Sequence, residues 1–316
     1  MTDQLYFHKT LIKSQHFLVH INPSLNLKSF LRDGAFAWQA KKRNIPLLVF
    51  WHGWDKPFSQ VVEKHLLWFF RQTFGRADCF IVLASEFKHK LRAWGVTAPV
   101  HLGTTAVEEQ LIQGFNLEKK IEAIRTCNTL KILFLARLER AKGVFETVQA
   151  VRLLLDKNFP VSLTIAGDGH IRQELEQYCQ SLDLTEQQVC FIGDVRGEEK
   201  ISTFAEHHIY CLPSYGEGLP NSVLEAMAFA MPVTTRPVGG LADMFEDGVM
   251  GGLAQGKTSE EIASVLERLI TDREKLVAIA RYNAAYAKEY FMASVVAAEL
   301  QRIYGTILPD DAGTVE

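Results

Sequence analysis

Cysteine is scarce in this sequence, and its positions exclude a zinc centre or a disulfide framework. The 316 residues contain five cysteines, namely Cys79, Cys127, Cys179, Cys190 and Cys211. Their number is odd, and no two of them have the Cys-x-x-Cys spacing of a metal or redox motif. Scattered thiols of this kind are typical of a reducing compartment. We therefore expect a cytoplasmic chain without disulfides.

Long apolar runs are also lacking. No run approaches the roughly 18 residues that a membrane-spanning helix needs. The first twenty residues carry Asp3, Lys9 and Lys13, which is unlike a secretory leader. With 47% hydrophobic and 22% charged residues, the composition is that of a globular protein, long enough for two domains.

Two motifs of nucleotide and metal chemistry are incomplete or missing. Gly167, Asp168 and Gly169 follow the apolar run VSLTIA, but Arg172 occupies the place of the third glycine in a dinucleotide-binding fingerprint. This argues against a dehydrogenase. No Asp-x-Asp pair is present to hold a divalent cation against a diphosphate. We therefore expect neither a metal site nor a resident cofactor.

Charge is distributed unevenly along the chain. Residues 1–128 contain 17 Lys and Arg against 10 Asp and Glu, a net charge of +7, and the remainder contains 17 against 27, a net charge of −10, which sum to −3. A basic first half can face anionic lipid, an anionic acceptor or the acidic half of the chain. Ordinary variation in solvated surface charge explains the same numbers equally well.

Short apolar runs alternate with helical patterns in both halves, which predicts parallel βα units. In the first half we expect strands at 17–21, 46–51, 79–84 and 99–102, with helices at 25–42, 57–75 and 86–94. In the second half we expect strands at 131–136, 161–166, 189–192, 208–212 and 232–235, and a helical end over 258–306. The polar stretch 103–129 places a domain boundary near 128, and 307–316 reads as a disordered tail.

Two segments of the first half invite a functional interpretation. VFWHGWD puts His52 just beyond the carboxyl end of a strand, where open α/β sheets bind their ligands. His52 is therefore a candidate site residue. The helix LLWFFRQTF has an apolar face that suits either a membrane surface or the core, and we favour the core.

A strand-to-helix loop in the second half carries two candidate diphosphate-binding cations. In ARLERAKG, Arg137 and Lys142 are spaced so that both fit one such loop and bind a diphosphate without a metal. Two surface cations are the plainer interpretation of this segment alone.

The segment 211–240 has the features of a site for a phosphorylated sugar. Gly218, Leu219, Pro220 and Asn221 are expected at a helix start, with Pro220 as the first helical residue, where free backbone amides attract an anion. Glu217 and Glu225 offer acceptors for sugar hydroxyls. Either glutamate alone is more simply structural, but the apolar neighbours of Glu225 predict a buried carboxylate, which needs a partner.

The ordered set ARLERAKG, LTIAGDG, CFIGDV, LPSYGEGLPNSVLEAMA and PVTTRPVGG resembles the C-terminal domain of retaining glycosyltransferases of family 4. The resemblance covers residues 129–306 well, and 17–105 more loosely. It implies the GT-B fold, an α/β architecture of two Rossmann-like domains that face a cleft. The domains would be 1–128 on the acceptor side and 129–306 on the nucleotide-sugar side.

The resemblance also implies roles for the candidate residues. Arg137 and Lys142 would bind the donor diphosphate and Glu225 the nucleotide ribose. Glu217 would bind donor-sugar hydroxyls, and His52 would approach the donor sugar from the first domain. The donor-binding set would be Gly167, Gly218, Leu219, Pro220, Asn221 and Glu225. The donor, a nucleoside-diphosphate sugar, is a substrate and not a cofactor.

The chain departs from the family pattern at several positions. Ala136 stands where glycine is usual, Asp243 where glutamate is usual, and Met250 where asparagine is common. The family's first strand and glycine-rich loop have no counterpart at the start, so we expect an abbreviated N-terminal domain. Either the start is truncated, or a partner protein supplies the missing part, or acceptor binding is built differently here.

The function that the resemblance implies is transfer of a sugar, with retention, to a hydroxyl of a glycan or lipid-linked acceptor in cell-surface or exopolysaccharide synthesis. The enzyme would be metal-independent and cytoplasmic, with peripheral contact at the inner membrane face through its basic half. No nucleic acid partner is expected. The alternative is a catalytically silent nucleotide-sugar-binding subunit that needs a partner. A sugar-nucleotide epimerase of similar fold is disfavoured by the continuous segment from Glu217 to Glu225.

Overall fold

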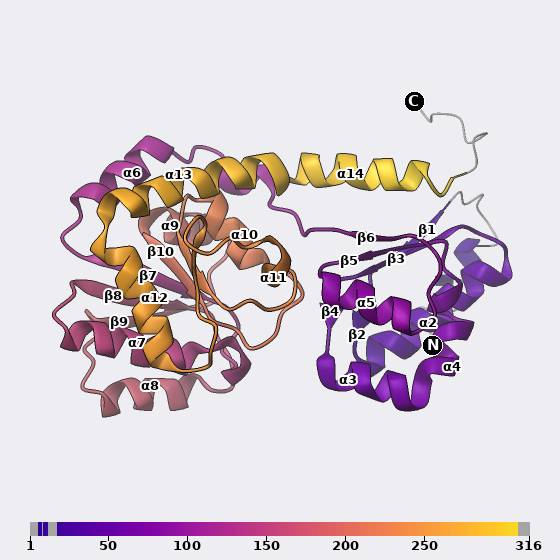
Figure 1. Ribbon diagram of the computed structural model, residues 1–316, viewed down its shortest axis with the longest axis horizontal. Helices are drawn as coiled ribbons and strands as arrows, with labels where there is room; N and C mark the ends of the chain where they lie inside the picture. The colour runs from indigo at the N-terminus through magenta and orange to yellow at the C-terminus, as the bar shows by residue number, and fades with distance from the viewer. Residues whose placement is uncertain (1–5, 8, 12–17, 309–316) are drawn as a thin grey trace. The chain divides into compact units, whose positions relative to one another are not determined.

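The computed structural model describes residues 6–7, 9–11 and 18–308 (Figure 1). Contacts between residues divide the chain into two compact units, each of which combines parallel strands with helices. Unit 1 comprises residues 1–104, 217–219 and 297–316. Unit 2 comprises residues 105–216 and 220–296.

Unit 1 contains a parallel sheet in the strand order β1-β3-β5-β6. Its strands are β1 (Val19–Ile21), β3 (Leu47–Trp51), β5 (Cys79–Val82) and β6 (Val100–Leu102). The helices that connect them are α2 (Leu27–Lys42), α3 (Lys56–Val61), α4 (Leu67–Gln72) and α5 (Ser85–Ala93), with a π-helical turn, η1 (Val62–Leu66), between α3 and α4. Two short strands, β2 (Ser24–Leu25) and β4 (Gly53–Trp54), form a separate parallel pair.

Unit 2 contains a larger parallel sheet in the order β12-β11-β10-β7-β8-β9. Its strands are β7 (Leu130–Leu135), β8 (Val161–Ala166), β9 (Val189–Gly193), β10 (Ile209–Leu212), β11 (Val233–Thr235) and β12 (Gly251–Leu253). Its helices are α6 (Leu117–Thr126), α7 (Val144–Asp156), α8 (Arg172–Ser181), α9 (Gly197–Glu206), α10 (Asn221–Ala228), α11 (Leu241–Met244), α12 (Ser259–Thr271) and α13 (Arg273–Tyr290). The last helix, α14 (Ala293–Gly305), begins in unit 2, and its residues from Ala297 onward belong to unit 1.

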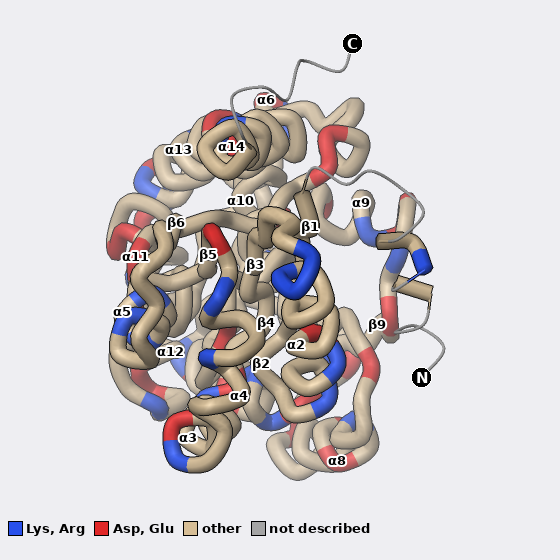
Figure 2. The backbone as a smooth tube through the Cα atoms, turned by 90° about the vertical axis from the view of Figure 1, so that its right-hand side faces the viewer, with Lys and Arg blue, Asp and Glu red and all other residues tan. Residues whose placement is uncertain are grey.

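Helix α2 combines basic and exposed apolar side chains. It carries Lys28, Arg32, Lys41 and Lys42, with Asp33 as its acidic residue (Figure 2). Large apolar residues on the same helix also face solvent, namely Leu27 (55% exposed), Leu31 (46%) and Trp38 (44%). The ammonium group of Lys42 lies 4.9 Å from the centroid of the Trp38 ring. Unit 1 therefore has one helix surface that is both cationic and apolar.

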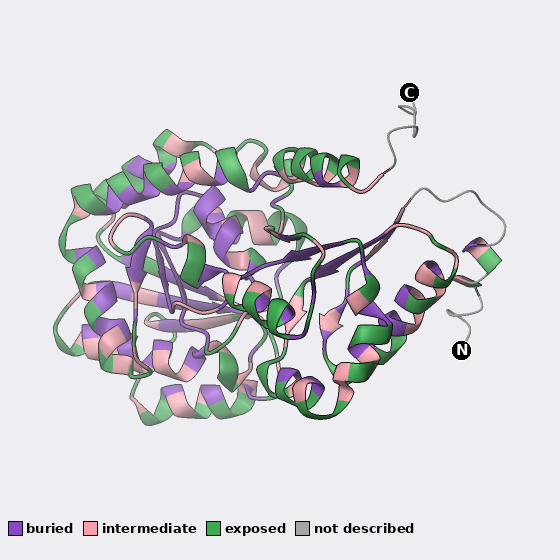
Figure 3. Cartoon of the chain, turned by 45° about the vertical axis from the view of Figure 1, so that its right-hand side comes forward, coloured by how far each residue is buried: buried purple, intermediate pink, exposed green. Residues whose placement is uncertain are grey.

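The strands form the cores of the two units (Figure 3). All five residues of β3 (LLVFW) and all four of β10 (IYCL) are buried. Continuous apolar runs of this kind are expected for parallel strands that are covered on both faces. Aromatic rings fill much of the core of unit 1, where Phe30, Phe70 and Phe74 are fully buried.

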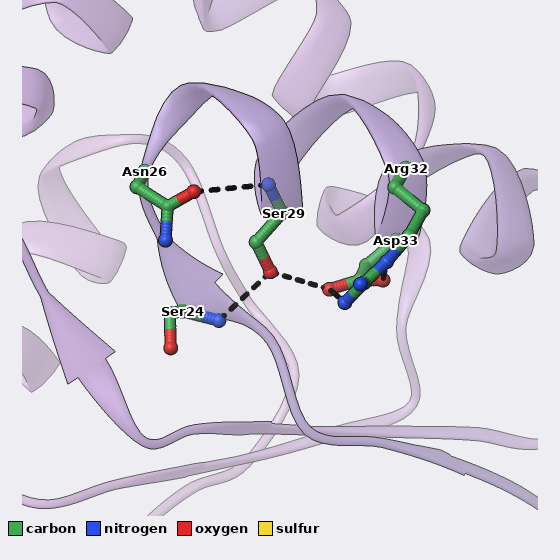
Figure 4. A network of polar contacts seen from close by, with 5 residues as sticks. All are labelled: Ser24, Asn26, Ser29, Arg32 and Asp33. Atoms are coloured by element: carbon green, nitrogen blue, oxygen red, sulfur yellow. Dashed lines mark hydrogen bonds and ion pairs between the residues drawn. The ribbon is translucent and has the colours of Figure 1, made fainter.

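Polar contacts fix the start of α2 immediately after β2 (Figure 4). The side-chain oxygen of Asn26 accepts a hydrogen bond from the amide of Ser29 at 3.0 Å and so caps the helix. The Ser29 hydroxyl accepts from the amide of Ser24 at 3.1 Å and donates to Asp33 at 2.6 Å. The buried Asp33 carboxylate also pairs with Arg32 at 2.6 Å. This network holds the chain between β1 and α2 in one conformation.

A buried lysine connects two helices of unit 2. Lys120 of α6 is 3% exposed, and its ammonium group donates to the carbonyls of Phe204, at 2.8 Å, and Ala205, at 2.9 Å. The carbonyl of His207 is its third acceptor. The last carbonyls of a helix have no partners within the helix. Lys120 therefore caps the carboxyl end of α9 from another element.

The predicted α/β alternation is confirmed, with small differences at the ends of elements. The strand expected at 161–166 is β8, whereas the one expected at 208–212 is β10, which begins at Ile209. The helix expected at 57–75 is divided by the π-helical turn η1. In LLWFFRQTF, Phe70 is buried, as the core interpretation requires, but Trp68 is 66% exposed. Phe17 and the residues of the expected tail from 309 onward lie outside the described residues.

The contact-based units place residues 217–219 and 297–306 with unit 1, and they also differ from the predicted domains in where residues 105–128 belong. These residues group with unit 2, because α6 packs against α13 and Lys120 binds the end of α9. That the chain folds as independent domains with boundaries at 128 and 306 stays a prediction.

Candidate active site

The loop between β7 and α7 contains the two predicted diphosphate-binding cations. Arg137 follows β7 directly, with its side chain 74% exposed and its guanidinium donating to Glu139 at 2.9 Å. Lys142 ends the single turn η4 (Arg140–Lys142). Gly143 then adopts a left-handed conformation (φ 75°) that starts α7. Both cations thus lie at the carboxyl edge of the unit 2 sheet.

A cavity of about 460 Å³ opens at the carboxyl ends of β7, β8 and β9. Arg137, Gly167, Asp168, Asp194 and Val195 are among the residues that line it. Gly167 has φ 135°, and a Cβ atom there would lie 2.0 Å from the carbonyl oxygen of Ala136. A side chain at 167 would therefore push the Arg137 loop away. The structure brings Arg137 and Gly167 together in one cavity.

The segment after β10 is held against the Lys142 loop. A Cβ atom at Gly143 would lie 2.4 Å from the carbonyl oxygen of Pro213, so only glycine permits this approach. The amide of Tyr215 donates to the carbonyl of Ala141 at 2.9 Å. The buried Arg236, which sequence reasoning did not identify, donates to the carbonyl of Pro213 and stacks at 4.2 Å over the Tyr215 ring. The turn that leads to α10 therefore starts beside the predicted diphosphate-binding loop.

Helix α10 begins at Asn221, so Pro220, which the sequence predicted as the first helical residue, is instead the N-cap. Among the residues that the structure describes, no side chain caps this end of the helix. The unpaired amides of a helix start, together with the helix dipole, favour an anion. Leu219 and Pro220 are buried, whereas Asn221 is exposed. The geometry suits a phosphate group at the start of α10.

The carboxylate of Glu225 is buried and paired, as its apolar neighbours predicted. Its side chain is 14% exposed, and Oε1 accepts a hydrogen bond from Nζ of Lys200 at 2.7 Å. Burial raises the pKa of Glu225 above its ordinary value, whereas Lys200 lowers it. Lys200 lies on α9 and is itself 25% exposed. Nothing in the sequence pattern identified Lys200 as the partner, because the contact joins residues 25 positions apart.

Four predicted site residues belong to unit 1. His52 follows β3, and its Nε2 lies 3.0 Å from the side-chain oxygen of Asn22. Glu217, Gly218 and Leu219 connect Gly216 with Pro220 and group with unit 1 by their contacts. The roles assigned to these residues at the donor sugar stay predictions.

The segment GGLAQGKT (251–258) has the spacing of a phosphate-binding loop. Its first glycine lies inside β12 and not in a loop after a strand. The amide of Gly256 already donates to Oε1 of Glu261 at 2.9 Å, and the hydroxyl of Thr258 caps α12. The segment is therefore a strand followed by a capped helix, and its amides are not arranged around a phosphate.

The described residues contain neither a metal-binding cluster nor a membrane-spanning helix. No group of three or more His, Cys, Asp and Glu side chains there is arranged to hold a metal ion. None of the helices described has both the length and the apolar character needed to cross a bilayer.

Comparison with known proteins gives a family model that matches the second half of the chain and relatives that match more of it. The family model described as "Glycosyl transferases group 1" matches residues 118–286. The amylovoran biosynthesis glycosyltransferase AmsK of Erwinia amylovora is 27% identical over 294 residues, which cover 91% of this chain and 69% of AmsK. The capsular polysaccharide biosynthesis glycosyltransferase CapM of Staphylococcus aureus is 26% identical over 198 residues, 62% of this chain and 51% of CapM.

A solved structure supports the fold assignment. The structure of Anabaena HepE in complex with UDP and glucose superposes with a TM-score of 0.74 at 18% identity, covering 96% of this chain and 80% of HepE. At this identity the similarity establishes the fold alone. It confirms the GT-B fold that the sequence resemblance implied.

Proposed function

Because the chain belongs to the glycosyl transferases group 1 family, we propose that it transfers a sugar from a nucleoside-diphosphate donor to a hydroxyl group, with retention of the anomeric configuration. The acceptor is a glycan or a lipid-linked sugar in the synthesis of a cell-surface or exported polysaccharide. AmsK and CapM, which are named for amylovoran and capsular polysaccharide biosynthesis, support this choice of product.

The observation that carries the proposal is the arrangement at the carboxyl edge of the unit 2 sheet. Arg137 and Lys142 share one loop, the start of α10 follows a segment held against that loop, and Glu225 lies on the same helix. In the proposed complex the two cations bind the diphosphate, the α10 amides bind a phosphate oxygen, and Glu225 accepts hydrogen bonds from the ribose. Gly167 leaves room for the donor beside Arg137.

In the proposed reaction the acceptor oxygen attacks the anomeric carbon on the face from which the diphosphate leaves. The carbon–oxygen bond to the acceptor forms as the bond to the diphosphate breaks, and the acceptor proton passes to a diphosphate oxygen. Arg137 and Lys142 stabilise the charge that develops on the leaving group, which is the largest electrostatic contribution of such a site. Glu217 and His52 hold the donor sugar, and the glutamates do not act as an acid and nucleophile pair.

A second candidate function is a nucleotide-sugar-binding subunit without activity of its own. The specific observation in its favour is that the described residues of unit 1 form a four-stranded sheet, whereas those of unit 2 form a six-stranded sheet. In this version a partner protein completes the acceptor side. The two functions predict the same nucleotide binding and differ in turnover.

We place the enzyme at the cytoplasmic face of a membrane that holds its acceptor. The cationic and apolar surface of α2, with Lys28, Lys42, Leu31 and Trp38, supports a peripheral contact with anionic lipid.

The first test is thermal unfolding of the purified chain with UDP, GDP, ADP, CDP and dTDP. A ligand at 100 times its dissociation constant stabilises a protein by about 2.7 kcal/mol. We expect one nucleoside diphosphate to raise the unfolding temperature, and Lys142→Ala and Glu225→Ala to abolish this increase. Arg152→Ala is the control, because Arg152 forms a 2.5 Å ion pair with Asp156 on α7.

The outcomes separate the candidates. Stabilisation that both site variants abolish, together with release of the nucleoside diphosphate from its sugar donor, supports the enzyme. Stabilisation without release of the nucleoside diphosphate supports the binding subunit, provided that release begins when a partner protein is added. If none of the five nucleotides stabilises the chain, the proposed donor site is refuted.

A further inference from the structure

Lys200 binds one oxygen, Oε1, of the Glu225 carboxylate, which the proposed function assigns to the ribose. Nζ of Lys200 lies 2.7 Å from Oε1 of Glu225, and the two side chains are only 25% and 14% exposed. An ion pair on an open surface contributes little, but a shielded pair fixes both partners more firmly. The contact also joins α9 to α10, and thus the β9 side of the sheet to the β10 side.

A ribose presents two neighbouring hydroxyls, each of which needs an acceptor. A carboxylate has two oxygens and about four lone-pair positions. With Oε1 bonded to Lys200, the plane of the Glu225 carboxylate is set, and Oε2 keeps its acceptor capacity. The ammonium group of lysine has only donors to offer, so it cannot take the place of the acceptor.

We propose that Lys200 is a positioning residue for nucleotide recognition: it holds the carboxylate of Glu225 in one orientation, so that this carboxylate distinguishes a ribose from a 2′-deoxyribose. This inference rests on the proposed function, because it takes the ribose to be the ligand of Glu225. Lys200 acts through Glu225 and need not contact the nucleotide.

The charges around Glu225 make the dependence on Lys200 strong. Burial raises the pKa of Glu225, and Glu108, from the segment before η3 (Glu109–Ile112), raises it further. Lys200 of α9 opposes both effects. Without the lysine, the effects that raise the pKa of Glu225 are no longer opposed, and a protonated carboxyl group turns one acceptor into a donor.

The experiment measures the dissociation constants of UDP, GDP, ADP and CDP, each beside its 2′-deoxy analogue, by calorimetry between pH 6 and pH 8. For the unsubstituted chain we expect the ribonucleotide that binds to do so about tenfold more tightly than its 2′-deoxy form, since a hydrogen bond to a charged group is lost. In Lys200→Met we expect this ratio to fall to within about twofold, because the carboxylate loses the hydrogen bond that orients it.

Three further variants make the result specific. Lys200→Arg keeps the charge and should keep most of the ratio, whereas Glu225→Gln should lose it at every pH. Lys157→Met is the matched control, because Lys157 forms a 2.5 Å ion pair with Glu267 elsewhere in unit 2. It should leave the ratio unchanged. Circular dichroism of each variant excludes loss of folding as the cause.

The possible failures are distinct. If no ribonucleotide binds the unsubstituted chain, the role of Lys200 is refuted, and the donor site itself is refuted only if dTDP also fails to bind. A ratio that Glu225→Gln leaves unchanged refutes the ribose assignment of Glu225. A ratio that Glu225→Gln removes but Lys200→Met preserves at pH 6 overturns the present inference and leaves the proposed function standing.

Discussion

Arg137 is more exposed than Lys142, the other predicted diphosphate-binding cation of the loop between β7 and α7. Its guanidinium pairs with Glu139 of the same loop, and with 74% of the side chain exposed it has room to turn toward a ligand in the cavity beside Gly167. An exposed ion pair within one loop adds little stability. Its replacement should therefore affect catalysis far more than folding.

We expect Arg137→Ala to lower the turnover of the donor by about 100-fold or more, because a charge-stabilising donor at the leaving group is lost. The measurement is release of the nucleoside diphosphate that the nucleotide panel identifies, with the unfolding temperature recorded in parallel. Arg152→Ala should leave the rate unchanged. A rate for Arg137→Ala within a few-fold of the unsubstituted chain would remove Arg137 from the site.

At the level of single residues, the sequence predicted those that lie in contiguous segments and missed those that meet through the fold. Arg137, Lys142 and Glu225 belong to segments whose spacing is visible in the chain. Lys200 and Arg236 reach the site only because α9 packs near α10 and because the turn after β11 reaches Pro213. A local pattern contains no information about such contacts until the strand order is known.

The junction between α9 and β10 is built on two buried histidines. His207 contacts the carbonyl of Thr203 at 2.6 Å and the hydroxyl of Thr164 at 2.7 Å, and His208 accepts from the amide of Lys131 at 3.1 Å. Burial lowers the pKa of His207 to about 4 and that of His208 to about 3. Both histidines are therefore neutral in the folded protein over most of the acidic range.

This junction should make unit 2 sensitive to acid. Since the pKa of His208 is about 3 when folded and 6.5 when unfolded, the unfolded state binds more protons between these values, so stability is full above pH 6.5 and is lost as the pH falls toward 3. At pH 5 the cost from His208 is about 2 kcal/mol. In His208→Asn, urea unfolding should show a correspondingly smaller loss between pH 7.5 and pH 5.

The control for this prediction is His170→Asn, because His170 is exposed. It should show the same loss with pH as the unsubstituted chain. An equal loss in His208→Asn would mean that other groups account for the acid sensitivity.

At the level of elements, the alternation of strands and helices was predictable because parallel strands leave continuous apolar runs, as in β3 and β10. The short elements were not. β2 and β4 have two residues each, and the glycine-rich β12 lacks the β-branched residues that indicate a strand. The π-helical turn in the expected helix 57–75 has no sequence signature of its own.

For the molecule as a whole, residues 1–128 carry a net charge of +7 and the rest carry −10. This distribution predicts that the basic half binds anionic membrane surfaces. Attraction of basic residues to anionic lipid contributes about 1 kcal/mol for each Lys or Arg near the surface and falls with salt. We expect the chain to cosediment with vesicles that contain phosphatidylglycerol, but not with phosphatidylcholine alone, and to dissociate at high salt.

Substitutions on and away from α2 test whether this helix contacts the anionic vesicles. The double substitution Leu31→Ser and Trp38→Ser should reduce the bound fraction several-fold, since it removes apolar surface next to the lysines. Tyr290→Ser, which replaces a 47% exposed aromatic residue of unit 2, should not. Equal binding to both kinds of vesicle would contradict an electrostatic contact.

The position of Lys120 has a consequence for chemical labelling. Its amine is enclosed by α6 and by the last carbonyls of α9, whereas most lysines of the chain are open to solvent. Acylating reagents modify an amine only when they reach it, so Lys120 should react only when α6 separates from α9. The rate at which the peptide that contains Lys120 gains an acyl group, followed by mass spectrometry, then reports how often α6 separates from α9.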